Sequence, residues 1–327
     1  MRSHQAGQDP SAARVRRPAW HSDQSVARIP PPDDSQKPDP ELETAAETFL
    51  LVRGRLFGIA YRMLGSVADA EDIVQEVWVR WHGCDRSLVR DPGAFLATTT
   101  TRLALNLMQS ARVRHEAYVG PWLPEPIDTA VNAELLAEQA ETIEIVVLFL
   151  LERLTPIERA AYVLREAFDY PYRQIADILR CTEVNARQLV SRSRKHVASE
   201  RRTPVQASEQ HRFLKAFLDA ARSGNLAALE ALLTEDVVSY SDGGDVFHAA
   251  RFPLLGRTRV AKFVLAVSEW FWDGVDVQWI EANGQPALRL SVRGEQTALI
   301  ALSVTDEGID RLFWMMNSTK LDGVLPA

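Results

Sequence analysis

The residues best suited to chemistry form a basic group after the middle of the chain: Arg187, Gln188, Arg192, Arg194 and Lys195. Arg and Gln side chains make paired hydrogen bonds to guanine and adenine edges in the major groove. Arg and Lys also bind phosphate oxygens, which position a protein on DNA without reading its sequence. The group therefore predicts DNA binding, with Arg187 and Gln188 at base edges and the other three at phosphates.

Two other polar surfaces are candidates for binding. Arg102, Asn106, Arg112 and Arg114 share the polar side and the end of one predicted helix, and they indicate a second DNA contact. Asp72, Gln75 and Glu76 share a polar face of the helix before it. Because that face is acidic, it does not suit nucleic acid and instead fits either solvent or a basic protein partner.

One cluster could support acid–base catalysis: Tyr240, Asp242, Asp245 and His248. The same residue types also form turns between strands, and this is the reading that we favour. Cys84 and Cys181 stand alone, without the spacing of a zinc site or a disulfide framework. We therefore expect a protein that is not an enzyme and that uses neither a cofactor nor a metal.

Composition limits the class of protein. The chain has 327 residues, 46% of them hydrophobic and 25% charged, which is enough apolar material for more than one core. No apolar run is long enough for a membrane span or a secretory signal, so we expect a cytoplasmic protein without a membrane partner. The net charge is −7, yet residues 172–202 carry +5 and residues 204–327 carry −5. This pattern excludes a non-specific nucleic-acid binder, which would be basic throughout.

The first half of the chain divides into three predicted segments. Residues 1–45 hold seven of the 17 prolines without periodic apolar residues, which predicts a disordered tail. Residues 46–114 predict helices, with helix starts at Ser66 and at Asp91 before a proline. Residues 115–136 form a proline-rich linker, in which three prolines exclude a helix interior.

The second half divides into two predicted domains. Residues 137–202 predict a long amphipathic helix that ends near Leu154 and, later, a helix-turn-helix with Thr182 capping its second helix. Residues 204–327 predict two helices followed by strands, with a hairpin turn at Asn283 and Gly284. The expected fold is therefore multidomain: two all-α domains and then an α+β cone-shaped domain.

Two motifs resemble those of extracytoplasmic-function sigma factors, and in particular the SigJ-like subgroup with a C-terminal SnoaL-like domain, and two further segments match that subgroup in part. DAEDIVQEVW at residues 69–78 resembles the helix of that family that binds core RNA polymerase. YVGPWLPEP at residues 118–126 is similar to the linker of the subgroup. DGGDV at 242–246 and NSTKL at 317–321 partly match its two C-terminal motifs.

The resemblance implies a function and a role for each segment. Residues 46–114 would bind core polymerase, through Asp69, Asp72, Gln75 and Glu76, and would read the −10 promoter element. Residues 137–202 would read the −35 element, and residues 204–327 would regulate transcription initiation. The partners would be core RNA polymerase, promoter DNA and a small-molecule or protein effector of the C-terminal domain.

Regulation would act through contacts of Trp122, Leu123, Asp242 and Lys320, and we also expect Trp314 to dock against the linker. Two alternatives remain open from the residues alone. One is a ligand-sensing helix-turn-helix repressor, which has no need of the helix at residues 69–81. The other is an enzyme in the C-terminal cone, which would require its polar cluster to converge in a pocket.

Overall fold

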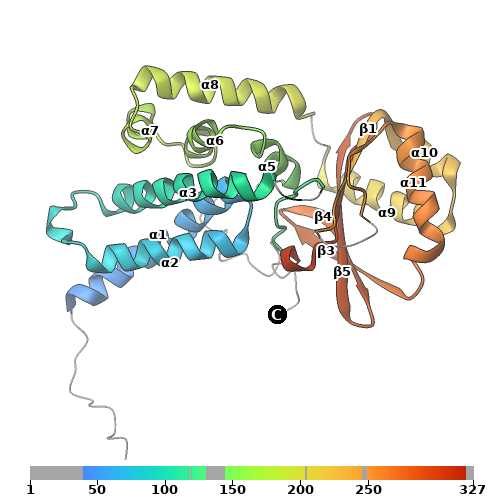
Figure 1. Cartoon of the computed structure of the whole chain (residues 1–327), viewed down its shortest axis with the longest axis horizontal. Coiled ribbons are helices and arrows are strands. Elements are labelled where there is room, and N and C mark those ends of the chain that lie inside the picture. Colours follow the sequence, from blue (N-terminus) through green and yellow to red (C-terminus); the bar gives the residue numbers. More distant parts are fainter. Residues whose placement is uncertain are drawn as a thin grey trace, which may run out of the picture. The chain divides into compact units, whose positions relative to one another are not determined.

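The computed structural model describes residues 40–116, 118, 120–129, 144–202, 205–244 and 249–321. Helices come first and a sheet comes last, as predicted (Figure 1). No helix in these ranges is long and apolar enough to cross a membrane. The helices are α1 (Pro40–Leu64), α2 (Val67–Gly83), α3 (Pro92–Glu116), α5 (Ile145–Leu151), α6 (Pro156–Tyr162), α7 (Tyr172–Leu179), α8 (Glu183–Glu200), α9 (Ala207–Ser223), α10 (Leu226–Leu232) and α11 (Arg257–Phe271).

Helix α1 begins earlier than predicted. Its start at Pro40 places residues 40–45 in the helix, so the prediction of a disordered tail was wrong for these residues, and residues 1–39 lie outside the described ranges. Two features stabilise this start. Acidic residues in the first turn interact favourably with the helix dipole. Ala45 is buried, and its carbonyl accepts a hydrogen bond of 3.0 Å from Trp81 Nε1.

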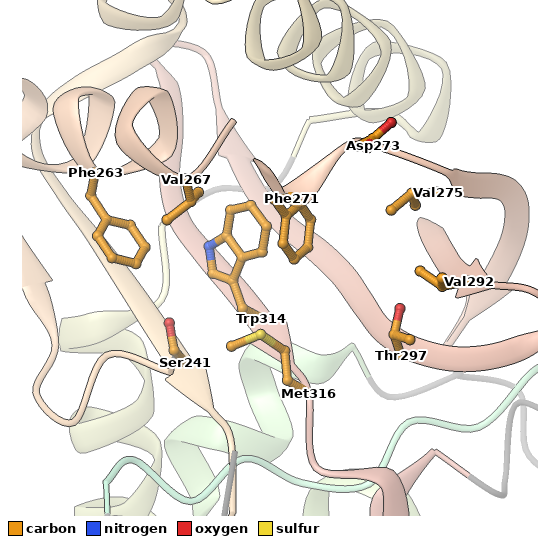
Figure 2. Close-up of a pocket in the computed structure, with 10 residues that line it drawn as sticks. All are labelled: Ser241, Phe263, Val267, Phe271, Asp273, Val275, Val292, Thr297, Trp314 and Met316. Carbon is orange, nitrogen blue, oxygen red and sulfur yellow. The ribbon is translucent and has the colours of Figure 1, made fainter. Parts of the chain in front are cut away.

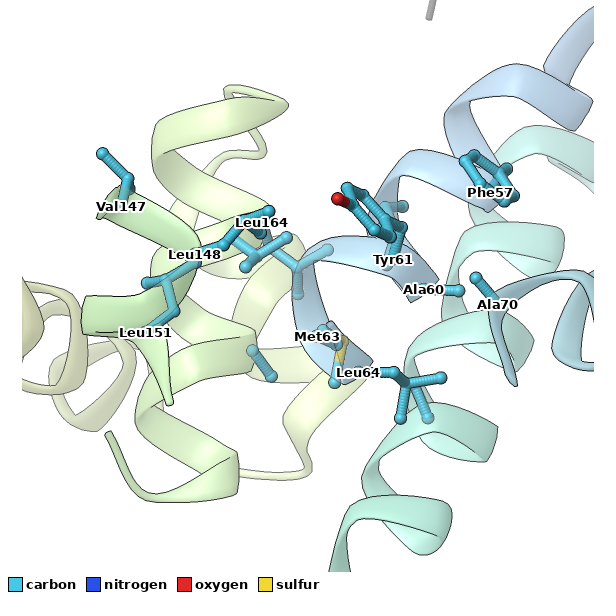
Figure 3. Close-up of a cluster of buried hydrophobic side chains, with 14 of the residues drawn as sticks. Phe57, Ala60, Tyr61, Met63, Leu64, Ala70, Val147, Leu148, Leu151 and Leu164 are labelled. Atoms are coloured by element: carbon cyan, nitrogen blue, oxygen red, sulfur yellow. The ribbon is translucent and has the colours of Figure 1, made fainter. Parts of the chain in front are cut away.

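The predicted starts of α2 and α3 are confirmed. Ser66 Oγ accepts a hydrogen bond from Asp69 N at 3.2 Å, and Asp91 Oδ1 accepts one from Ala94 N at 3.0 Å. Each cap satisfies a backbone N–H that has no partner within the helix. Buried side chains of α1, such as Tyr61, lie between those of α2 and α5 in Figure 3.

The helix predicted to end near Leu154 differs from its prediction. Its described part is α5, Ile145–Leu151, in which all seven side chains are buried, so it is not amphipathic. The reason is its position between α1 and the sheet, where Phe149 packs 4.5 Å from the ring of Tyr240. Residues 137–143, within the predicted helix, lie outside the described ranges.

Helices α7 and α8 form the predicted helix-turn-helix. Helix α7 ends at Arg180, whose φ of 55° and ψ of 48° are left-handed. Thr182 caps α8, since its hydroxyl accepts a hydrogen bond from Asn185 N at 3.2 Å. Glycine favours the left-handed region, so the turn holds an arginine at a position that costs it conformational energy.

The sheet has six strands in the order β2-β1-β6-β5-β4-β3, and only β1 and β6 run parallel to each other. The predicted hairpin is confirmed: Asn283 and Gly284 both have positive φ, as a type I′ turn requires, between paired Ala282 and Gln285. A two-residue strand, β2, was not predicted, because two residues carry no periodic signal. The strands are β1 (Leu233–Asp242), β2 (Leu254–Leu255), β3 (Val275–Ala282), β4 (Gln285–Val292), β5 (Glu295–Thr305) and β6 (Gly308–Met315).

The two faces of this sheet belong to different hydrophobic cores. Helices α9, α10 and α11 cover one face, which includes Leu312 and Trp314 (Figure 1). Phe313 and Met315 point to the other face and join the core of α1 to α8. Strand residues alternate between faces, so one sheet closes the C-terminal core and completes the helical one.

We expect the two substitutions Arg180→Gly and Arg180→Val to act in opposite directions. Glycine accepts the left-handed conformation, so it should leave the free energy of unfolding unchanged or raise it by up to about 1 kcal/mol. Valine is branched at Cβ and should lower it by about 1–2 kcal/mol. Urea unfolding of both variants measures this, and equal stability of the two would contradict the assigned turn.

Candidate polymerase and nucleic-acid surfaces and the linker contact

The predicted acidic face of α2 is exposed. Asp72, Gln75 and Glu76 lie in solvent opposite the buried stripe of the helix, and Asp69 lies half-exposed in its first turn. Val79, which is 62% exposed, continues this face. The exposed ion pair of Glu76 with Arg80, 2.8 Å long, holds these side chains only weakly. The face thus combines negative charge with an apolar residue, which suits a protein partner.

The five basic and polar residues predicted on α8 are all exposed. They lie opposite the side that packs on α6 and α7, where Leu189 and Val190 are buried. The structure therefore brings together every residue that the sequence predicted for this DNA surface: Arg187, Gln188, Arg192, Arg194 and Lys195.

Carboxylates already contact part of this surface. Arg194 lies 2.6 Å from Glu166, and this hydrogen-bonded partner raises the pKa of the Arg194 guanidinium. Arg187 lies 2.6 Å from Glu183, and its guanidinium stands 4.6 Å above the ring of Tyr172. A phosphate that binds at this surface would compete with these carboxylates for the arginines. Within the described ranges, the side chains of Gln188 and Lys195 have no such partner.

The second predicted DNA surface, on α3, is divided. Asn106 is exposed, whereas the side chains of Arg112 and Arg114 lie outside the described part of the chain. Arg102 binds the end of α7: its Nε donates to the carbonyl of Ile178 at 3.1 Å and its Nη2 to that of Asp177 at 3.0 Å. Burial, followed by the nearby charge of Arg180, lowers the pKa of Arg102. The sequence did not predict this contact between α3 and α7.

The predicted regulatory residues converge where the linker meets the C-terminal domain. Asp242, only 1% exposed, accepts hydrogen bonds at Oδ2 from Leu123 N at 2.7 Å and from Lys320 Nζ at 2.8 Å. Its other oxygen accepts a hydrogen bond from the hydroxyl of Tyr118, which in turn accepts one from Asn317 Nδ2 at 3.0 Å. We call these five residues, Tyr118, Leu123, Asp242, Asn317 and Lys320, the clasp.

Lys320 joins three parts of the clasp through one ammonium group. Besides its bond to Asp242, Nζ donates to the carbonyl of Leu123 at 2.8 Å and lies 3.8 Å from the ring centre of Trp122. Burial lowers the pKa of Lys320, and the charge of Asp242 opposes this effect. Removal of either partner of such a buried ion pair strongly lowers the stability of the fold, because the remaining buried charge is left uncompensated.

Two other expectations for this region are wrong. Trp314 does not dock against the linker, because strand alternation points its ring into the C-terminal core, where Nε1 donates to Ser239 Oγ at 3.1 Å. The reading of the polar cluster as turn residues is also wrong for Tyr240 and Asp242, because both belong to strand β1. Tyr240 packs in the helical core and Asp242 belongs to the clasp, while Asp245 and His248 lie outside the described residues.

Comparison with known proteins identifies the helical part. The Sigma-70 region 2 family model matches residues 48–114, and the Sigma-70 region 4 model matches residues 145–197. ECF RNA polymerase sigma factor SigJ of Mycobacterium tuberculosis is 36% identical over 235 residues, covering 69% of this chain and 74% of SigJ. The chain belongs to the extracytoplasmic-function sigma factors.

The resemblance to SigJ includes the C-terminal domain. The crystal structure of Mycobacterium tuberculosis SigJ matches with a TM-score of 0.68 and 30% identity, covering 85% of this chain and 98% of that one. The probable sigma factor SigI of the same organism is 28% identical over 276 residues, covering 83% of this chain and 92% of SigI. The repressor alternative finds no support among these relatives, and the SigJ-like assignment is confirmed.

A second contact of the linker in this sigma factor was missed by the sequence analysis. Asn283, in the predicted hairpin turn, donates from Nδ2 to the hydroxyl of Tyr61 at 2.9 Å and accepts at Oδ1 from Ile127 N at 3.0 Å. Tyr61 of α1 in turn donates to the carbonyl of Glu125 at 2.6 Å. The Asn-Gly pair signalled only a turn, and nothing local indicated that its amide binds residues more than 150 positions away.

The linker also determines how α2 begins. Glu125 Oε2 accepts a hydrogen bond of 2.6 Å from Val67 N, in the first turn of α2, where a negative charge is favourable. Gly65, with φ of 65°, makes room for the linker, because a Cβ there would lie 2.8 Å from Cη2 of Trp122. Helix α2 is therefore positioned by the linker as well as by its own cap.

We expect Glu125→Gln to change how stability depends on pH. Burial raises the pKa of Glu125 above its ordinary value of 4.5 in the folded chain. Just above pH 4.5 the folded chain therefore keeps a proton that the unfolded chain has lost, so this group stabilises the fold less as the pH rises. Glutamine keeps an acceptor for Val67 N and does not titrate.

The measurement is urea unfolding of wild type and Glu125→Gln from about pH 4 to pH 7. The stability of the variant relative to wild type should rise with pH across this window. Glu47→Gln, at an exposed position on α1, is the matched control and should show no such trend. A stability difference that stays constant with pH would contradict the assignment.

Proposed function

We propose that this sigma factor binds core RNA polymerase through region 2, reads promoter DNA through both helical domains, and is regulated in cis by its C-terminal domain. Residues 46–114 bind polymerase and the −10 element, residues 137–202 bind the −35 element, and residues 204–327 regulate initiation. The exposed helix-turn-helix surface in a chain of this family is the observation that carries the proposal.

The polymerase surface is the exposed face of α2. Asp72 and Glu76 supply negative charge to a basic partner, while Val79 supplies an apolar contact. One support is the Sigma-70 region 2 match. The other is the fixed start of α2, where Ser66 and Glu125 each accept a hydrogen bond from a backbone N–H of the first turn. A rigid surface loses little conformational entropy on binding.

The promoter surface is α8, with α3 as the second reader. Arg187 and Gln188 are exposed on α8 and contact base edges, and Lys195 contacts phosphate. Arg102 reads DNA only after it leaves the carbonyl groups at the end of α7. Promoter binding by α3 therefore competes with the contact between the two helical domains.

Regulation depends on the clasp and on the hydrophobic core that the sheet shares with the sigma helices. The linker is held by Asp242 and Lys320, and the sheet face that carries Phe313 completes the core of the sigma helices. Arg311 Nη2 also donates to the carbonyl of Glu200, at the end of α8, at 2.7 Å. These contacts favour one arrangement of the two DNA-reading domains, and an effector that binds arrangements differently shifts their populations.

The polymerase surface is tested by reversing the charges of α2. We expect the double variant Asp72→Lys/Glu76→Lys to keep its thermal stability, since both side chains are exposed, and to bind purified core polymerase at least tenfold more weakly. The control is Glu295→Lys/Asp306→Lys, which makes the same charge change at two exposed positions of the C-terminal domain. Equal core binding by the two folded variants would refute this surface.

The regulatory contact is tested by Asp242→Asn. This change leaves the Lys320 charge buried without its carboxylate, which costs about 3–5 kcal/mol at the clasp. We expect the amide of Leu123 to exchange its hydrogen faster, and transcription from a target promoter to change at least threefold, in either direction. Core binding should stay within twofold of wild type.

A second variant separates loss of the clasp from general unfolding. Asp242→Asn/Lys320→Met removes both charges and should recover stability, because no uncompensated charge stays buried, while the clasp remains broken. Point variants test the clasp more specifically than deletion of residues 204–327. That deletion would also expose Phe149 and other core side chains of α1 to α8 that pack against the sheet. Wild-type transcription by a stable double variant with an exposed linker would overturn the regulatory role.

A further inference from the structure

The C-terminal domain contains a cavity that the sigma function does not use. It measures about 270 Å³ and lies between α11 and the sheet (Figure 2). Phe263, Val267 and Phe271 of α11 form one wall, and Trp314 of β6 forms the floor. The clasp residue Asp242 does not line the cavity, because it points to the opposite face of the sheet. The cavity is therefore separate from the linker contact.

Two aromatic side chains of this cavity, Phe271 and Trp314, stand nearly at right angles to each other. The rings of Phe271 and Trp314 lie 5.9 Å apart with an interplanar angle of 81°. Trp314 is held in place by its hydrogen bond to Ser239. A flat ring that enters can stack on one of these side chains and meet the edge of the other, which is the geometry that aromatic groups prefer.

Charge and size narrow the class of ligand. Asp273 at the mouth, exposed to solvent, is the sole ionisable side chain in the lining that the structure describes. Arg222 lies outside this lining, where it donates to the carbonyl of Val275 at 3.4 Å. An anionic ligand is therefore disfavoured. A cavity of about 150 Å³ holds benzene, so 270 Å³ accommodates two fused rings.

Two hydroxyl groups give this apolar cavity its polar contacts. Ser241 and Thr297 line it from β1 and β5. Thr297 donates to the carbonyl of Leu290 at 3.3 Å, so the lone pairs of its oxygen can accept a hydrogen bond from a ligand. We propose that the cavity binds a neutral bicyclic aromatic molecule that carries a hydroxyl group.

Two residues that line the cavity are adjacent in sequence to residues of the clasp. Ser241 precedes Asp242, and Met316, which also lines the cavity, precedes Asn317. The carbonyl of Asp242 accepts hydrogen bonds from both Met316 N, at 2.7 Å, and Asn317 N, at 3.1 Å. A ligand that presses on Ser241 or Met316 therefore acts on the segments that hold the linker. This coupling rests on the proposed regulatory role of the clasp, whereas the binding site does not.

Binding is tested on the full chain by titration calorimetry with 2-naphthol and with 2-naphthoate, which differ in charge. We expect 2-naphthol to saturate one site and 2-naphthoate to bind at least tenfold more weakly. Val267→Trp, which fills the cavity, should weaken 2-naphthol binding at least tenfold, whereas Val184→Trp, at an exposed position on α8, should not. Asp273→Asn should strengthen 2-naphthoate binding at least threefold.

Each outcome decides the proposal. It is overturned by the absence of saturable 2-naphthol binding, by equal affinity for the two probes, or by unchanged binding in folded Val267→Trp. If Val267→Trp fails to fold, the exposed variant Asp273→Asn decides instead, and no gain for 2-naphthoate refutes the site. Hydrogen exchange at the Leu123 amide tests the coupling. At least a threefold change with 2-naphthol supports it, and no change with the site occupied overturns the coupling alone.

Discussion

The structure depends on one constraint: residues 120–129 of the proline-rich linker lie largely buried between two domains, and their backbone polar groups must still find partners. Three prolines remove backbone donors and prevent regular secondary structure in this segment. The remaining groups cannot be left unpaired in an apolar interface. Asp242 and Lys320 satisfy Leu123 on one side, and Asn283 satisfies Ile127 on the other. The linker therefore fixes the C-terminal domain to the sigma helices through hydrogen bonds of defined geometry.

The second organising feature is a sheet that serves two cores. Its inner face packs on α9, α10 and α11 and forms the cavity floor, while its outer face packs on α5 and the linker. A change on one face is felt on the other, because neighbouring residues of a strand point in opposite directions. Ser241 and Asp242 are neighbours of this kind, since Ser241 lines the cavity and Asp242 binds the linker.

Electrostatics in this sigma factor works at two levels. Net charge separates a basic DNA-reading segment from an acidic C-terminal domain, and this long-range field is screened by salt. The contacts that hold the arrangement are short and partly buried, such as Lys320 with Asp242 and Arg102 with the carbonyl groups of α7. Buried contacts are screened much less, so salt weakens them less than it weakens interactions between the surface charges.

The sequence by itself determined the features that depend on local chemistry. Ser66, Thr182 and the Asn-Gly pair specified helix starts and a hairpin, because a cap or turn needs only a few neighbouring residues. Apolar periodicity located the helix-turn-helix and the exposed basic face of α8 for the same reason. The family motifs also singled out Leu123, Asp242 and Lys320, and the structure brings these three residues into contact.

Only the tertiary structure decided which distant partner each of these groups meets. A strand residue can point to either face of its sheet, so the sequence alone did not determine the direction of Trp314. Long-range packing places its ring in the C-terminal core, beside the cavity, rather than against the linker. Arg102 has the side chain of a DNA contact, yet the approach of α7 gives it carbonyl partners. Asn283 signals a turn in any protein, and its bonds to Tyr61 and Ile127 exist because folding brings three remote segments together. Such pairings depend on the whole fold, and no local pattern encodes them.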